Sequence, residues 1–93
     1  MSGLRFVIAF LVLAGCAGSM KSGSPEARDH YDRAVAFYSR GRLNDSIEEY
    51  QLALQESPGM VKAHFGLGVA YMKTGFHRGA VLALGEAIEL QPN

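Results

Sequence analysis

Three histidines and one cysteine are the first candidates for metal binding or nucleophilic chemistry in this 93-residue sequence. His30 and His64 stand 34 residues apart, without the CxxC or clustered histidine spacing of a structural metal site. Glu48 and Glu49 are adjacent, so on a helix they point about 100° apart and cannot flank one substrate as a carboxylate pair. We find no Ser/His/Asp or Cys/His set and no glycine-rich phosphate loop. The sequence predicts a protein that is not an enzyme and uses no cofactor.

The charge balance and the length of the chain restrict the kinds of partner that we expect. The chain has nine basic and nine acidic residues, and no basic patch of the kind that neutralises phosphates, so we do not expect nucleic acid as a ligand. A single cysteine cannot form an internal disulfide. A chain of this size buries only a small core, so help from a partner is expected.

The cysteine, Cys16, follows closely on an unbroken apolar run from Phe6 to Leu13. A helix of that length reaches about 12 Å, whereas the hydrocarbon core of a bilayer is about 30 Å thick. The run is too short to span a membrane, and it has the length of the apolar region of a secretory signal peptide. Arg5 supplies the positive charge that such peptides carry before the apolar run.

The residues Leu13, Ala14, Gly15 and Cys16 resemble the lipobox of bacterial lipoproteins. The resemblance implies that residues 1–15 are a signal peptide cleaved before Cys16, whose thiol carries lipid. Two or more acyl chains anchor a protein stably to a membrane. It implies a lipid-anchored protein of the bacterial cell envelope, on the periplasmic side of the outer membrane in a Gram-negative host, because Ala17 is not Asp. The alternatives are an ordinary cleaved signal and an N-terminal helix with a buried cysteine.

Residues 16–25 are small and polar and predict a flexible tether. The remaining chain repeats itself with a period of 34 residues: His30 pairs with His64, and the other identical pairs are Val35 and Val69, Ala36 and Ala70, Gly41 and Gly75, Ala53 and Ala87, and Pro58 and Pro92. Such self-similarity is typical of repeat architectures. The pattern predicts four helices of about fourteen residues, namely Glu26–Arg40, Asn44 or Asp45 to Ser57, Val61–Thr74 and His77–Leu90. Short loops make neighbouring helices antiparallel.

Both units resemble the tetratricopeptide repeat. The second unit matches its pattern at Leu67, Gly68, Tyr71, Gly75, Ala80, Leu84, Ala87 and Pro92, and the first at Ala34, Phe37, Gly41, Ser46, Tyr50, Ala53 and Pro58. Arg33 departs from the usual Leu, and His30 and His64 replace the common Trp, which suggests packing roles for both histidines. The resemblance implies an all-α fold of two helix-turn-helix repeats, residues 26–60 and 61–93, forming a fragment of a right-handed α-solenoid. Small residues at Ala34 and Ser46 are expected where two helices approach closely.

In that family the first helix of each unit lines a concave face that holds a protein or peptide partner. Carried over by position, the resemblance implies a partner-binding groove formed by Arg28, Tyr31, Asp32, Val35, Tyr38, Lys62, Phe65, Val69, Met72 and Lys73. The family's clamp for C-terminal carboxylates needs Lys and Asn where this chain has Tyr31 and Val35, so that mode of binding is not expected.

The last predicted helix is apolar around most of its circumference, and a terminal repeat normally has a polar outer face or a cap. We consider truncation at Asn93, self-association through this helix, or a capping partner, and favour truncation. The function predicted is a membrane-anchored scaffold for protein–protein interaction in the bacterial envelope, with pilus or secretion assembly among the roles that the resemblance implies. The alternative is a docking fragment of a longer repeat protein or of an enzyme complex.

Overall fold

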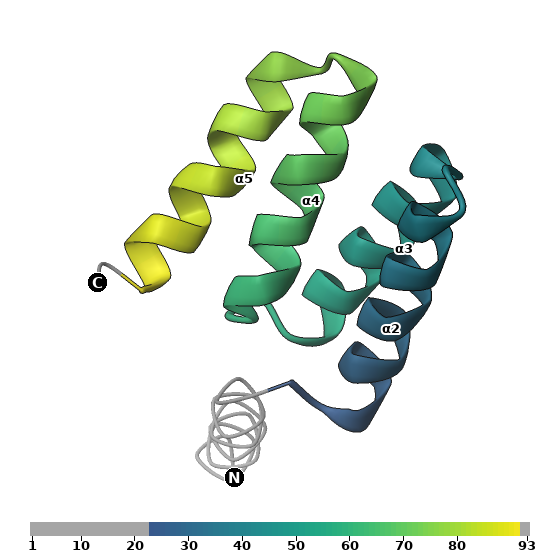
Figure 1. Cartoon of the computed structure of the whole chain (residues 1–93). Coiled ribbons are helices and arrows are strands. Elements are labelled where there is room, and N and C mark those ends of the chain that lie inside the picture. Colours follow the sequence, from purple (N-terminus) through teal and green to yellow (C-terminus); the bar gives the residue numbers. More distant parts are fainter. Residues whose placement is uncertain (1–22, 92–93) are drawn as a thin grey trace, which may run out of the picture.

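The computed structural model describes residues 23–91, which form four α-helices (Figure 1). They are α2 (Pro25–Ser39), α3 (Leu43–Glu56), α4 (Val61–Thr74) and α5 (His77–Leu90). The bounds predicted for the last two helices are correct, and those for the first two differ by one or two residues. The predicted signal peptide, Cys16 and most of the tether lie outside the described residues.

Ser24 explains why α2 begins at a proline. Its hydroxyl accepts a hydrogen bond from the amide of Ala27 at 3.1 Å, which caps the first turn. Pro25 lacks an amide hydrogen, and the first helical position is one where none is needed. The amide of Ser24 in turn donates to the hydroxyl of the buried Ser57 at 3.2 Å. The start of α2 is therefore tied to the connection between α3 and α4.

The turns inside the two helical hairpins have the same backbone structure. Gly41 and Gly75 have φ angles of 79° and 86°, the left-handed region that favours glycine. Two residues provide the same closing bond: the amide of Arg42 donates to Phe37 O, and the amide of Phe76 donates to Tyr71 O, both at 2.9 Å. These pairs are related by the 34-residue period, so the repeat seen in the sequence is also a repeat in structure.

The core consists mainly of alanines, which let the helices approach closely. Ala34 and Ser46 are fully buried, and the Ser46 hydroxyl donates to the carbonyl of Ala34 at 2.8 Å. This confirms the predicted close approach within the first repeat. In the second repeat Gly68 lies against Leu84, and a Cβ at Gly68 would be 2.6 Å from Leu84 Cγ. Small residues on one helix thus make room for larger side chains on the next.

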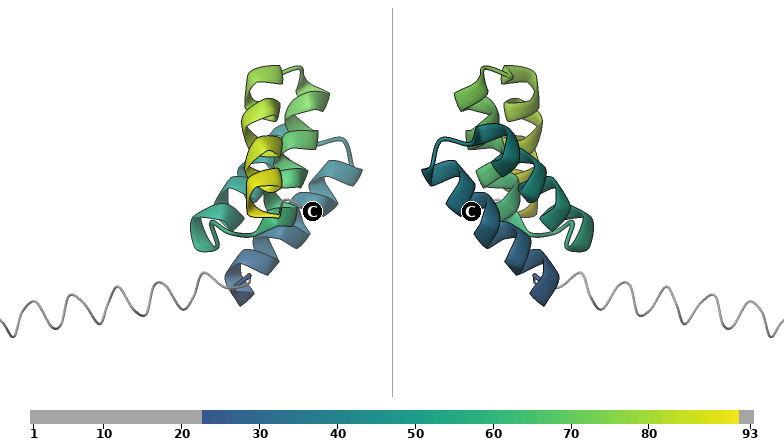
Figure 2. Two further views of the ribbon diagram at one scale, coloured as in Figure 1. Left: turned by 90° about the vertical axis from the view of Figure 1, so that its left-hand side faces the viewer. Right: turned by 90° about the vertical axis from the view of Figure 1, so that its right-hand side faces the viewer.

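The two hairpins lie side by side, with α2 and α3 in one and α4 and α5 in the other (Figure 1). The hairpins meet mainly through α3 and α4, and the side views show that they are stacked at an angle (Figure 2). This arrangement leaves α2 at one end of the stack and α5 at the other. None of the helices between residues 23 and 91 is long and apolar enough to cross a membrane.

Candidate functional site

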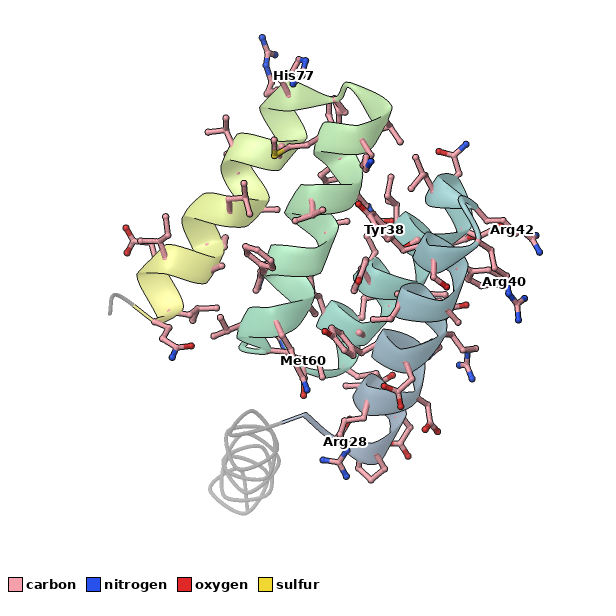
Figure 3. The ribbon with its side chains drawn as sticks, viewed as in Figure 1. Arg28, Tyr38, Arg40, Arg42, Met60 and His77 are labelled. Atoms are coloured by element: carbon pink, nitrogen blue, oxygen red, sulfur yellow. The ribbon has the colours of Figure 1, made fainter. Side chains whose placement is uncertain are left out.

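A hollow of about 210 Å³ lies between the two hairpins. Each of three helices contributes to its lining: α2, α3 and α4 supply Tyr31, Tyr38, Tyr50, Lys62, Phe65, Gly66 and Val69. In the side-chain view Tyr38 lies between the two hairpins (Figure 3). The hollow is mostly apolar, with hydroxyl groups and one ammonium group at hand. It has the chemistry of a site for an apolar side chain with a polar neighbour.

Half of the ten predicted groove residues line this hollow. They are Tyr31, Tyr38, Lys62, Phe65 and Val69. Arg28 instead borders a separate hollow at the start of α2, where its guanidinium donates to the carbonyl of Gly23 at 3.0 Å. The remaining four are exposed on α2 and α4 outside the lining, namely Asp32, Val35, Met72 and Lys73. A binding role for any of the ten stays a prediction.

Tyr50 lines the hollow although the sequence analysis assigned it to the repeat pattern and not to the groove. It is buried, and its ring meets that of Tyr31 edge to face with centroids 5.7 Å apart. The ring fits because Gly66 lacks a side chain: a Cβ there would lie 2.6 Å from the Tyr50 hydroxyl oxygen. Glycine at this position, where the first repeat has Asp32, was the signal in the sequence that a large side chain approaches α4.

Electrostatics differ between the base and the rim of the hollow. Burial, and then the neighbouring Tyr31 and Tyr38, raise the pKa of Tyr50 to about 12, so its hydroxyl stays neutral at physiological pH. The Lys62 ammonium lies 4.9 Å from the centroid of the Tyr31 ring, within the range of a cation–π contact. The hollow therefore has an uncharged base and a positive group at its rim.

The histidine shared by both repeats makes a different contact in each. In the first repeat His30 Nδ1 lies 2.7 Å from Glu49 Oε1 and 3.1 Å from Arg33 Nη2. A carboxylate only accepts hydrogen bonds, so Nδ1 carries the proton and donates to Glu49, and the guanidinium is merely adjacent to it. Arg33 Nε donates to the same carboxylate oxygen at 3.3 Å. The predicted packing role of His30 thus includes a charged partner, which joins α2 to α3.

His64 has no acid opposite it, because Ala83 takes the place that Glu49 has in the first repeat. Its Nε2 lies 2.9 Å from the carbonyl oxygen of Pro58 in the α3–α4 loop. His77 is exposed at the first position of α5 and points away from the helices (Figure 3). Among residues 23–91 no three His, Cys, Asp or Glu side chains are grouped so that they could hold a metal ion.

The Glu49 contacts give an expected dependence of stability on pH. The hydrogen bond from His30, with smaller contributions from Arg33, holds the pKa of Glu49 below its usual value. Because the folded-state pKa is the lower one, this stabilisation is present above about pH 4.5 and is lost as the pH falls through the folded-state pKa. We expect Glu49→Gln to remove about 1 kcal/mol at pH 7 and to flatten the acid limb of stability. Urea unfolding between pH 3 and pH 7 measures both effects.

The control for this prediction is the neighbouring Glu48→Gln, since Glu48 is exposed on the same helix. It removes the same formal charge without touching His30. An equal loss of stability in both variants would contradict the assignment and point to a general charge effect.

Two further hollows adjoin the groove and share Phe65 with it. One of about 720 Å³ is bordered by the segment before α2, the start of α4 and the end of α5, with Arg28 and Met60 at the same end of the molecule (Figure 3). Another, of about 370 Å³, lies between α4 and α5. Phe65, which is 57% exposed, lines all three hollows and stands where they meet.

The chain is similar to known tetratricopeptide repeat proteins. A family model described as TPR repeat, the tetratricopeptide repeat, matches residues 34–75, which run from the middle of α2 to the end of α4. The chain is also similar to tetratricopeptide repeat protein 13 of Homo sapiens, with 37% identity over 65 aligned positions. That alignment covers 64% of this chain, and the chain spans only 8% of the human protein. The two hairpins also have antiparallel helices and the same turn structure. Together with these matches, this identifies the fold of the described residues as an all-α pair of tetratricopeptide repeats.

Proposed function

We propose that the protein is a scaffold that binds a protein partner in the hollow between its two hairpins. The observation that carries this proposal is the convergence of Tyr31, Tyr38 and Phe65 on one apolar hollow with Lys62 at its rim. Aromatic side chains give large contact areas for little loss of conformational freedom and are enriched where proteins bind one another. Tetratricopeptide repeats in general mediate protein–protein interactions, which supports the same conclusion.

The charges near the hollow indicate the chemistry of the partner segment. Among the ten predicted groove residues, Lys62 at the rim and the exposed Arg28 and Lys73 are basic, whereas Asp32 is acidic. The partner segment would place an apolar side chain over the tyrosines and an acidic group near Lys62. Charge complementarity of this kind contributes specificity and speeds association.

Site-specific photocrosslinking from Tyr38 tests this proposal. Tyr38 lines only the hollow between the hairpins, whereas Phe65 also borders the other two. A photoreactive residue at Tyr38 should capture a discrete partner in cells that express the chain, and Lys62→Glu should lower the yield several-fold. The matched control is the same photoreactive residue at Arg40, which caps the same helix and points to its other side (Figure 3). Equal capture from both positions, or capture from Arg40 alone, would show that the groove assignment is wrong.

We further propose that the scaffold is held at a membrane by lipid on Cys16, in the envelope of a bacterium. The support is the Leu13-Ala14-Gly15-Cys16 pattern after a short apolar run. A role in pilus or secretion assembly, or as a docking unit within a longer repeat protein or an enzyme complex, would use the same hollow. Self-association through α5 is a separate hypothesis, and it depends on whether the charged residues of α2 can pack against α5.

Replacing Cys16 tests the anchor independently of the groove. Cys16→Ser should abolish incorporation of radiolabelled palmitate and leave the precursor uncleaved, because no thiol remains to accept lipid. Labelling followed by gel electrophoresis measures both outcomes. Gly15→Ala keeps a small residue before the cysteine and should still be labelled. Palmitate incorporation that persists in Cys16→Ser would end the lipoprotein proposal while leaving the repeat scaffold untouched.

A further inference from the structure

A hollow lies between α4 and α5, the two helices of the second hairpin. Its volume is about 370 Å³, and it is lined by Val61, Phe65, Leu84, Ala87, Ile88 and Gln91, none of them charged. Ile88 is 64% exposed and its neighbour on the same face, Val81, is 71% exposed. Exposed apolar side chains gathered around one hollow are typical of an interaction site.

The first repeat shows what covers the equivalent surface there. Moving back by 34 residues, the lining corresponds to Ala27, Tyr31, Tyr50, Ala53, Leu54 and Ser57. Four of these are buried, and Tyr31 and Leu54 pack against the core. Helix α4 packs against this face of the first hairpin, mainly through α3 (Figure 1). The open face of α4 and α5 therefore corresponds, in the repeat register, to the face of the first hairpin that α4 covers.

Helix α4 also shows which side chains suit such a face. Ala63, Leu67 and Ala70 are buried where α4 meets the first repeat, at relative positions 0, +4 and +7 of one helical stripe. Lys62, next to this stripe, lies over the ring of Tyr31. Phe65 is the residue that corresponds to Tyr31 in the second repeat, so its exposed ring is placed to receive a cation from a helix bound in the same way.

A second copy of the chain cannot supply this helix by continuing the stack. The residues of α2 that correspond to the α4 stripe are Asp29, Arg33 and Ala36, and Glu26 corresponds to Met60. All four are exposed, and three are charged. Burying them against an uncharged hollow is unfavourable, because the carboxylates of Glu26 and Asp29 would lose water without gaining an opposite charge, and Arg33 already donates to Glu49. The α2 end is thus closed to head-to-tail association, whereas the α5 end accepts an apolar helix.

We propose that the α4–α5 hollow is a docking site for an amphipathic helix of a partner protein that presents Ala, Leu and Ala at positions 0, +4 and +7 and a basic side chain over Phe65. The site shares Phe65 with the groove between the hairpins, but its other lining residues differ, so it does not depend on the function proposed for that groove. Its specificity comes from small residues on the incoming helix, which allow the close approach seen between α3 and α4.

The chain itself provides a probe and a matched control. Residues 60–74 are added after Asn93 of the full chain, where Pro92 and Asn93 hold the positions of Pro58 and Gly59 in the register. The control extension is residues 26–40, the corresponding segment of the first repeat. The first extension should raise Tm by about 5 °C and slow amide exchange in α5 about tenfold, and the second should do neither. Introducing Ile88→Lys into the first fusion should cancel both gains.

Free labelled peptides with the same two sequences extend the test to a separate molecule. The α4 peptide should bind the full chain at least about tenfold more tightly than the α2 peptide in fluorescence anisotropy, and Ile88→Lys should abolish the difference. Equal effects of the two sequences, or no protection of α5 by either fusion, would overturn the proposal. So would a dimer of the unextended chain in sedimentation whose formation itself protects α5, because the occupant would then be a second copy.

Discussion

Replacing Tyr50 by alanine is expected to lower the free energy of unfolding by about 3–5 kcal/mol, which for a domain of this size can remove most of its stability. Tyr50 is 5% exposed and is the largest buried side chain in a core made mainly of alanines. Its ring fills the space between Tyr31 and Gly66, and Gly66 has no side chain that could fill the cavity left behind. Urea or thermal unfolding followed by circular dichroism measures the loss.

Two variants separate the contribution of the ring from its surroundings. Tyr50→Phe keeps the ring and should cost at most about 1 kcal/mol. Tyr38→Ala removes a half-buried tyrosine from the rim of the same hollow and should cost clearly less than Tyr50→Ala. If Tyr50→Ala proved as mild as Tyr38→Ala, Tyr50 would not be the central packing residue between the repeats.

Gly68→Val is expected to destabilise the second repeat by about 1–3 kcal/mol, because it overfills the closest approach between α4 and α5. A Cβ at this position would lie 2.6 Å from Leu84 Cγ and 2.7 Å from Leu84 Cδ2, so the leucine side chain must move, and the Leu84 backbone nitrogen at 3.4 Å limits the room for the valine methyl groups. Leu84 would also be pushed into the hollow that it lines with Ile88. Thermal unfolding gives the change, a fall of Tm by several degrees for each kcal/mol.

Gly85→Ala provides the opposite case on the neighbouring helix. Gly85 lies inside α5, and a Cβ there would meet nothing within 4 Å. Alanine should therefore raise stability by about 0.5–1 kcal/mol, through the lower conformational freedom of the unfolded chain and a better helix propensity. A destabilising Gly85→Ala, or a neutral Gly68→Val, would contradict the packing described for the second hairpin.

Local signals in the sequence were sufficient for the helices and their order. Gly41 and Gly75 each stand where the chain needs a positive φ, and Pro58 stands where α3 has ended, so the ends of the helices could be placed within two residues. The start of α2 depended on Ser24, whose capping bond is visible only once the chain is folded. The start of α3 was placed late because no side chain caps it.

The groove was only partly predictable. The repeat register places a residue on one face of a helix, but it does not show which side chains of neighbouring helices reach that face. Tyr31 and Lys62 were placed correctly beside the hollow, but Tyr50 reaches it from α3 because of the missing side chain at Gly66. The contact between His30 and Glu49 likewise joins residues 19 apart on different helices. Contacts of this kind depend on the angle and distance at which two helices cross, and these are set by the side-chain volumes of both helices.

The bond between Ser24 and Ser57 has a mechanical consequence. It fastens the first residue ahead of α2 to the junction of the two repeats, next to the Gly23 carbonyl that receives the Arg28 guanidinium. Tension applied to the chain from its N-terminal side would thus be shared with the α3–α4 junction, and would not act on the first turn of α2 alone. If the domain is pulled through the chain at residue 23, the N-terminal end of α2 should resist separation from the rest of the fold. The force would then act on the α3–α4 junction, where the two hairpins meet.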